Sequence, residues 1–453
     1  MNLRTPFAPA ADRIRRPSLF YQPNKVLSPV LLARHYRPTT DLTHEPAKRL
    51  LSGDVFACET LANETKLQKI WQGPGCSYSY ELPSGPQVAG YTDGGPTLKE
   101  AKPNEDAMAL GISGNEIISI VADGVGSHDQ PAITSKLAAS HVLTSTLAGT
   151  ALKPSLVDVT QILRTTFLQQ EDSSTTLTAS RFWETEGAWH FQHAGIGNSD
   201  SLLLARTHPD APWSLISQTD EHTFPAELRK ITLVLAQPAE NSPAQKEKKI
   251  RNFNFWRANM ASYEYYRQER EYPHMLQLCR LIAEADHAIA SSEAFVLDEH
   301  HPQMNRWIKA GLFVFTDAQK RAHPAASLLT EALGPNTPNS SLPEFSKPIL
   351  LHSGMTYLEL KTSDGFSDIF DLNETLALLH GISSAQDAVT LLAGAAFLAM
   401  DDHIKTRRLI SQLRRATDGL DLSTNERFTA LDQLKRRLSK LDNLTIQAVL
   451  LRP

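Results

Sequence analysis

Four aspartates occupy similar places in the sequence, each at the polar end of an apolar run. Asp106 opens the run "DAMALGI", and Asp123 closes "ISIVAD" before a glycine-containing loop. Asp364 follows "YLELKTS", and Asp442 stands just before the final run, "LTIQAVLL". A carboxylate at the end of a strand is held by a rigid element and still faces solvent or a ligand. The chemistry open to this chain therefore depends on whether the four strand ends converge.

If they converge, the four carboxylates form an oxygen-only cage of high negative charge. Such a cage suits Mg²⁺ or Mn²⁺ better than zinc, because no His or Cys joins it. The alternative interpretation is turn chemistry, since Asp beside Gly is common in turns, where its side chain bonds to the backbone. Turn chemistry is the commoner explanation for any one of the four. Their combination favours a metal site.

The elements that position these residues follow from hydrophobic periodicity. A short apolar run over 87–95 predicts a strand. The run that begins at Asp106 and the run that ends at Asp123 predict two more. Helical spacing predicts helices over 131–148 and 155–169, and the second begins at Ser155 as a potential N-cap. Strand-forming residues return over 174–219. Strands, then helices, then strands indicate an α+β or layered architecture.

Composition limits the function classes. The chain has 453 residues, 41% hydrophobic and 21% charged, with a net charge of −5, so no general basic field points to nucleic acid. Its three cysteines, Cys58, Cys76 and Cys279, form no CxxC pair, which predicts neither a disulfide framework nor a zinc site and fits a reducing cytoplasm. No apolar run reaches the ~18 residues of a membrane helix, so we expect no membrane span.

Eight segments resemble, in order, the successive motifs of a known family. They are "NEDA", "ADGVGSH", "STTLTA", "GIGNSDSLLLAR", "SQTDEHTF", "HPAASLLTEALG", "SGMTYLELKTSDGFSD" and "DNLTIQAVLL". The chain resembles the metal-dependent Ser/Thr protein phosphatases of type 2C in their bacterial form, from about residue 87 to 451, interrupted by helical insertions. The resemblance implies a four-layer α-β-β-α sandwich of two antiparallel sheets flanked by helices, with an inserted helical module.

The resemblance also implies a metal site and a reaction. Asp123 would bridge two Mn²⁺ or Mg²⁺ ions, the backbone carbonyl of Gly124 would bind one of them, and Asp106, Asp364 and Asp442 would complete the shells. The expected reaction is hydrolysis of phosphoserine or phosphothreonine in proteins by a water that bridges the two ions. Asp123 and Asp106 are the residues we expect to be catalytic. The implied partners are a phosphoprotein substrate and a cognate Ser/Thr kinase system.

One departure from the family affects the substrate phosphate. The family usually has Arg three residues before the Asn of "NED", and this chain has Ala101 there. Lys102 or Lys99 would supply positive charge, but without the bidentate fork of Arg.

A second departure affects a third ion. The family motif "GDSR" reads "GNSD" here, so Asn198 replaces an Asp associated with a third metal. Asn198 and Asp368 are therefore predicted third-metal or support residues, and the substitution argues against a third ion. His128 is open to two interpretations, a hydrogen-bonding residue that fixes its loop or a catalytic acid. These changes leave open a second function, a catalytically weakened phosphatase-like regulatory or scaffold protein that binds a partner.

Composition along the chain predicts its organisation. We expect an N-terminal arm and extension over 1–86 and a phosphatase-like domain over 87–453. A helical insertion over 225–304, a flap over 305–334 and a second helical insertion over 401–440 interrupt that domain.

The first insertion carries an aromatic stripe at three- and four-residue spacing: Phe253, Trp256, Met260, Tyr263 and Tyr266. With neighbouring arginines, such a stripe could stack bases of single-stranded nucleic acid. It is far more often the buried face of a helix, and we interpret it in that way.

Overall fold

The structure is a computed structural model that describes residues 49, 58–62, 66–95, 103–126, 128, 130–167, 173–223, 226, 329, 331–335, 343–370, 372–400 and 442–453. Residues 1–48 of the predicted N-terminal arm and extension, nearly all of the first helical insertion, all of the second and most of the predicted flap lie outside these residues.

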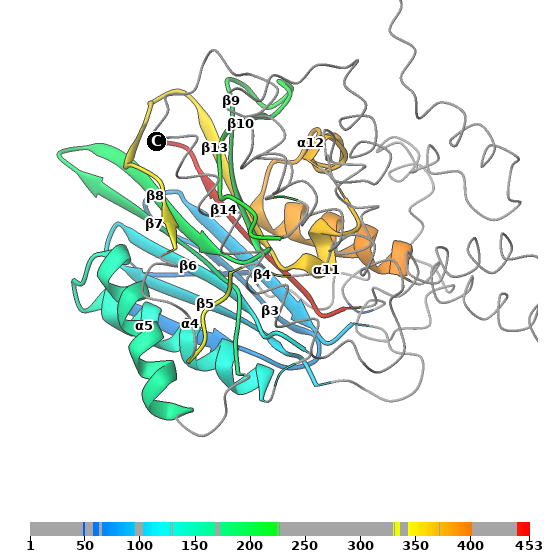
Figure 1. Ribbon diagram of the computed structural model, residues 1–453. Helices are drawn as coiled ribbons and strands as arrows, with labels where there is room; N and C mark the ends of the chain where they lie inside the picture. Colours follow the sequence, from blue (N-terminus) through cyan, green and yellow to red (C-terminus); the bar gives the residue numbers. More distant parts are fainter. Residues whose placement is uncertain are drawn as a thin grey trace, which may run out of the picture. The chain divides into compact units, whose positions relative to one another are not determined.

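Two β-sheets form the centre of the fold (Figure 1). Sheet A has the strand order β1 (Cys58–Thr60), β3 (Cys76–Glu81), β4 (Gln87–Asp93), β14 (Leu444–Leu451), β13 (Thr356–Thr362), β9 (Asp200–Arg206) and β10 (Ser214–Gln218). Sheet B has the order β11 (Glu344–Phe345), β8 (Ala188–Ile196), β7 (Leu177–Thr185), β6 (Glu116–Asp123), β5 (Asp106–Ser113) and β2 (Lys66–Trp71), and β12 (Ile349–Leu351) also pairs with β8. Among the described strands, β1 and β3 run parallel and the other pairs are antiparallel.

Helices cover the outer face of each sheet. On sheet B lie α4 (Pro131–Leu147) and α5 (Leu152–Thr166), which share a buried apolar cluster with β5, β6 and β7. On sheet A lie α11 (Asp364–Ser367), α12 (Leu372–Leu378) and a helix that runs from 385 to at least 400. A third apolar cluster fills the layer between the sheets. The predicted α+β class, with two antiparallel sheets flanked by helices, is confirmed.

Strand alternation decides which side chains face the layer between the sheets. In β6, Ile118 and Ile120 pack toward the helices, whereas Ile117 and Val121 face sheet A. Successive side chains of a strand point to opposite faces, so Asp123 shares the inner face with Ile117 and Val121. The same alternation in β5 places Asp106 on the inner face with Met108. Both carboxylates therefore belong to the layer between the sheets.

Three strands precede Gln87, the residue at which we expected the main domain to begin. The strand β2 lies at the edge of sheet B, where Leu67 is buried while Gln68 and Lys69 are exposed. An edge strand with so few apolar residues gives a weak periodic signal, which is why the sequence did not predict it.

The helix that we expected to begin at Ser155 begins instead at Leu152. Ser155 is not its N-cap. It is buried inside the helix, and its Oγ donates to the carbonyl of Ala151 at 3.0 Å. Pro154 is tolerated because the first turn of a helix does not need its N–H. In the part of the chain that the structure describes, no helix has both the length and the apolarity to cross a membrane.

Candidate metal centre

Two of the four aspartates meet across a strand pair of sheet B. Asp106 is the first residue of β5 and Asp123 the last of β6, and the antiparallel register pairs them directly. Residues paired in this way have Cα atoms roughly 4.5–5.5 Å apart, so side chains on the same face are close neighbours.

The other two aspartates come from neighbouring strands of sheet A. Asp364 is the first residue of α11, directly after β13, and Asp442 precedes β14. The Ser363 N–H donates to the Thr445 carbonyl at 3.0 Å, and the Thr445 N–H donates to Ser363 Oγ at 3.0 Å. These two bonds join the end of β13 to the start of β14. Asp364 and Asp442 therefore lie at the same end of this strand pair.

Asp106 is the buried member of the group. It is 0% exposed, and neither carboxylate oxygen has a hydrogen-bond partner among the described residues. Burial raises its pKa to about 7, and the negative charges of Asp364 and Asp442 raise it as well. The nearby hydroxyls of Ser363 and Thr445 act in the opposite direction and lower it. A carboxylate in this setting lacks a counter-charge.

Asp123 is affected by the same neighbours. Desolvation raises its pKa well above the usual value, and the charges of Asp106, Asp364 and Asp442 raise it further. Asp364 and Asp442 therefore act electrostatically on both Asp106 and Asp123. The structure brings the four predicted residues together from both sheets.

The four aspartates do not form a complete coordination shell for a metal ion. Within the described ranges, no three side chains of His, Cys, Asp or Glu are spaced to hold a metal ion. The donor set nevertheless suits a hard divalent cation, because it offers only oxygen atoms and two of them, on Asp106, are buried without hydrogen bonds. A cation would offset the mutual repulsion that raises the pKa values of Asp106 and Asp123.

Gly124 continues the backbone from Asp123 toward α4. A Cβ at this position would lie 2.3 Å from the carbonyl oxygen of Pro131, the first residue of that helix, so only glycine fits. The Gly124 N–H donates to the Glu105 carbonyl at 3.1 Å, and Thr175 Oγ1 donates to the Asp123 carbonyl at 2.8 Å. Close packing against α4 thus fixes the course of the chain beside Asp123.

Two asparagines link the sheets beside the carboxylates. Asn443 Oδ1 accepts from the Glu105 N–H at 3.1 Å, and its Nδ2 donates to the Gly94 carbonyl at 3.1 Å. Asn104 Nδ2 donates to Thr92 Oγ1 at 2.8 Å. In the sequence, "PNED" and "LDN" place Asn104 and Asn443 close to Asp106 and Asp442, but this proximity does not say that the two asparagines join opposite sheets.

Asn198, a predicted third-metal or support residue, contacts a predicted ligand. Its Nδ2 donates to Asp364 Oδ2 at 3.0 Å, and its buried Oδ1 has no hydrogen-bond partner in the described part of the chain. Asp368, the other predicted support residue, lies at the end of α11, where its N–H donates to the Asp364 carbonyl at 2.9 Å. Lys99 and Lys102, the predicted phosphate-binding residues, lie outside the described residues.

His128 holds its loop in place. Its Nδ1 lies 2.6 Å from Ser174 Oγ, and its N–H donates to the Val125 carbonyl at 2.9 Å. These contacts agree with the loop-fixing interpretation, and the catalytic-acid role stays a prediction.

No protein-family model matches the sequence, and no curated protein sequence matches it. Solved structures of bacterial Ser/Thr phosphatases are similar to this chain in fold. PstP/Ppp of Mycobacterium tuberculosis is 16% identical over 81% of this chain and 99% of its own, with a TM-score of 0.40. Stp1 from Staphylococcus aureus is 14% identical over 81% of this chain and 95% of its own, with a TM-score of 0.42.

The catalytic domain of PstP, solved with two manganese ions, is 15% identical over 80% of this chain and 97% of its own, with a TM-score of 0.38. Similarity at these identities and TM-scores assigns no activity to this chain.

Proposed function

We propose that this chain is a divalent-metal-dependent phosphomonoester hydrolase that acts on phosphoserine and phosphothreonine in proteins. The single observation that carries this proposal is the meeting of two carboxylates from each sheet at one edge of the sandwich, with Asp106 buried and lacking hydrogen-bond partners. Its proposed partners are a phosphoprotein and the Ser/Thr kinase that phosphorylates it.

In this proposal Mn²⁺ or Mg²⁺ is held by Asp106, Asp123, Asp364 and Asp442, together with the Gly124 carbonyl. The bound ions would supply an acidified water and the positive charge that offsets the phosphoryl group. The residues do the positioning: Asp106 and Asp123 are fixed by the β5–β6 register, and the Asn198 amide orients the Asp364 carboxylate. Lys99 and Lys102 remain the proposed sources of positive charge for the substrate phosphate.

Hydrolysis of p-nitrophenyl phosphate and of a phosphothreonine peptide tests the proposal, measured with Mn²⁺, with Mg²⁺ and with a chelator. We expect metal-dependent turnover that falls by about 100-fold or more in Asp123→Asn. Asp210→Asn is the matched control, because Asp210 is an exposed aspartate in the β9–β10 turn and the chemical change is the same. Turnover that persists in the chelator, or that Asp123→Asn leaves unchanged, would exclude this mechanism.

A second candidate is a phosphatase-like scaffold that binds a partner without turnover. One observation favours it: Asn198, where the family motif has Asp, donates its amide to one oxygen of Asp364. Calorimetric titration with Mn²⁺ separates the two candidates. Metal binding without hydrolysis of either substrate supports the scaffold, and metal binding with hydrolysis supports the enzyme.

A further inference from the structure

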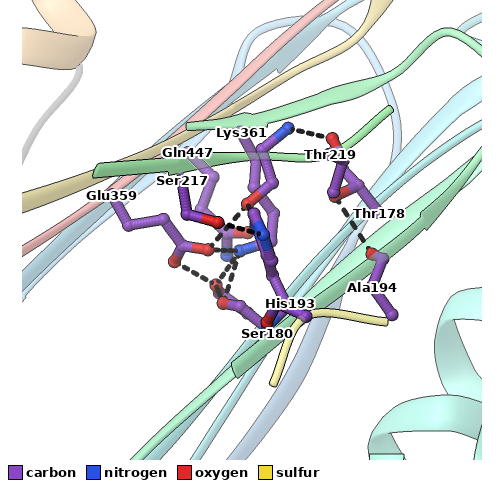
Figure 2. A network of polar contacts seen from close by, with 12 residues as sticks. Thr178, Ser180, His193, Ala194, Ser217, Thr219, Glu359, Lys361 and Gln447 are labelled. Atoms are coloured by element: carbon purple, nitrogen blue, oxygen red, sulfur yellow. Dashed lines mark hydrogen bonds and ion pairs between the residues drawn. The ribbon is translucent and has the colours of Figure 1, made fainter. Parts of the chain in front are cut away.

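A polar network crosses the largely apolar layer between the two sheets. Figure 2 shows it from close by. We call it the inter-sheet network; sheet B contributes Ser119, Ser180 and His193, and sheet A contributes Ser201, Glu359 and Lys361. All six side chains are buried, although apolar residues surround them.

Lys361 uses all three of its donors. Its Nζ forms an ion pair with Glu359 Oε1 and donates to Ser119 Oγ at 2.5 Å and to Ser180 Oγ at 2.6 Å. The lysine belongs to β13 of sheet A, whereas the two serines belong to β6 and β7 of sheet B. One ammonium group therefore joins three strands across the layer.

The donor and the acceptor of each remaining hydrogen bond can be assigned. Glu359 accepts from Ser119 Oγ at 3.0 Å and from Ser201 Oγ at 3.1 Å. Because Ser201 donates its only hydroxyl hydrogen to Glu359, it accepts from His193 Nδ1, 3.2 Å away. His193 Nε2 then accepts from Ser217 Oγ at 2.9 Å. Every member of the network thus has a partner, which is the condition under which a buried polar network specifies one arrangement.

A nucleophilic role for this network does not fit its burial. A serine beside an amine can serve as an activated nucleophile. However, Lys361 is 1% exposed, and Ser119 and Ser180 are 0% exposed, so no substrate reaches them. The network therefore contacts no substrate, and any effect that it has on the site acts through other residues.

Two strands of the network, β6 and β13, lead to site carboxylates. Ser119 precedes Asp123 by four residues on β6, and Lys361 precedes Asp364 by three residues at the end of β13. At about 3.3 Å per residue, the network lies roughly 10–13 Å from the carboxylates. Asp123 is the last residue of β6 in sheet B, and Asp364 lies two residues after the end of β13 in sheet A, so any sliding of one sheet on the other changes their separation.

Apart from the asparagine hydrogen bonds beside the carboxylates, the layer opposes such sliding mainly by apolar packing, which is non-directional. Stability alone also gives no reason for a buried ion pair, since apolar residues of similar size are often as stable or more so. We propose that Glu359 and Lys361 are positioning residues that lock sheet A in one alignment on sheet B and so set the separation of Asp364 from Asp123. The catalytic consequence of this alignment rests on the proposed function; the alignment itself does not.

The first experiment compares metal affinity with stability. In the double variant Glu359→Leu/Lys361→Met, we expect Mn²⁺ affinity to fall by about tenfold or more, as for other outer residues that orient ligands. The control is Leu351→Ala, which removes apolar side-chain volume from the same layer. Leu351 lies on β12, a strand without a site carboxylate. We expect Leu351→Ala to lower Tm and leave Mn²⁺ affinity unchanged. Unchanged affinity in the double variant would overturn the proposal.

A conservative variant separates alignment from bulk packing. Glu359→Gln/Lys361→Gln removes both charges and retains side chains that donate and accept hydrogen bonds. We expect it to recover most of the Mn²⁺ affinity lost in the apolar double variant. A merely structural role predicts instead that affinity follows Tm in all variants, and that result would also overturn the proposal.

The alignment can be measured without metal. Spin labels at Asn115, in the β5–β6 turn of sheet B, and at Asp210, in the β9–β10 turn of sheet A, report the distance between the sheets once the three native cysteines are replaced by serine. We expect one narrow distance in the otherwise unchanged chain. In the apolar double variant we expect a shift or broadening of about 3 Å, the rise of one strand residue.

Failure of the proposed function and failure of this inference give different results. If the unmodified protein neither binds Mn²⁺ nor hydrolyses phosphate esters, the proposed function fails, and the label distances still decide the alignment. An unchanged distance distribution in the apolar double variant would overturn the inference, whatever the protein catalyses.

Discussion

Asp106, the first residue of β5, is the direct register partner of Asp123, the last residue of β6. Like charges opposite each other on one face of a strand pair destabilise the sheet. Burial of Asp106 and the negative charges of Asp364 and Asp442 increase that cost. The arrangement is unfavourable without a counter-charge, a bound cation would offset that cost, and both effects can be measured.

Replacing Asp106 by Asn should stabilise the metal-free protein. The carboxylate pKa of about 7, against an ordinary 3.8, corresponds to a cost of up to about 4 kcal/mol at neutral pH. Urea unfolding in a chelator measures the change, and Mn²⁺ titration of the same variant should show weakened binding. A variant that is less stable than the parent in the chelator would contradict the unfavourable burial of this charge.

The stability of the metal-free protein should fall as pH rises from about 4 to about 7. Over this range folded Asp106 retains a proton that the unfolded chain has released, so the folded state binds more protons and each rise in pH favours unfolding. Above about pH 7 this contribution becomes constant. The measurement is the difference in Tm between the unmodified protein and Asp106→Asn at each pH. A difference that does not change with pH would contradict the raised pKa.

The strands and helices that carry the site could be predicted from local sequence. The run that begins at Asp106 and the run that ends at Asp123 are long, apolar and bounded by polar turns, so periodicity was sufficient to predict strands there. The meeting of Asp364 with Asp123 is different, because the two residues are 241 positions apart in the sequence, and no local pattern specifies which strands share a layer. That expectation came from the resemblance of ordered motifs.

The inter-sheet network was beyond prediction from local sequence. In β13, Leu358 and Leu360 alternate with Glu359 and Lys361, a pattern that ordinarily indicates a strand with one face in water. In the structure both faces of β13 are buried, and the polar face meets serines from the opposite sheet. Serines 119 and 180 lie within apolar strands, and only their partners in space give them a role.

Gly124→Ala should disrupt the junction between β6 and α4. The added Cβ would lie 2.3 Å from the Pro131 carbonyl oxygen, and backbone cannot yield as a flexible side chain can. We expect a loss of about 3 kcal/mol, at the high end for overpacking, with loss of metal binding. Gly187→Ala is the comparison, because Gly187 has φ +78° and no neighbour within 4 Å, so its cost of about 1 kcal/mol reflects backbone strain alone. Equal costs would show that Pro131 does not confine Gly124.

Asn198→Asp should change the metal stoichiometry. The new carboxylate would replace the amide that donates to Asp364 Oδ2 and would add a fifth acidic group to the site. We expect lower stability in a chelator, because like charges then adjoin, and stronger Mn²⁺ binding with additional ion uptake in calorimetric titration. Asn198→Ala tests the orienting role separately, since it removes the bond to Asp364 without adding charge. Identical Mn²⁺ titrations for all three proteins would exclude Asn198 from the site.

Lys361→Met alone should be more damaging than the double variant Glu359→Leu/Lys361→Met. The single change leaves the Glu359 carboxylate buried without its counter-ion, and breaking a buried pair in this way typically costs about 3–5 kcal/mol. The double change removes both charges and should cost less. The difference should narrow as pH falls, because a buried, unpaired Glu has a raised pKa in the folded state and is stabilised by protonation. Urea unfolding at pH 5 and pH 8 measures both effects. A single variant as stable as the double variant at pH 8 would mean that Glu359 is not held in the network as an ion.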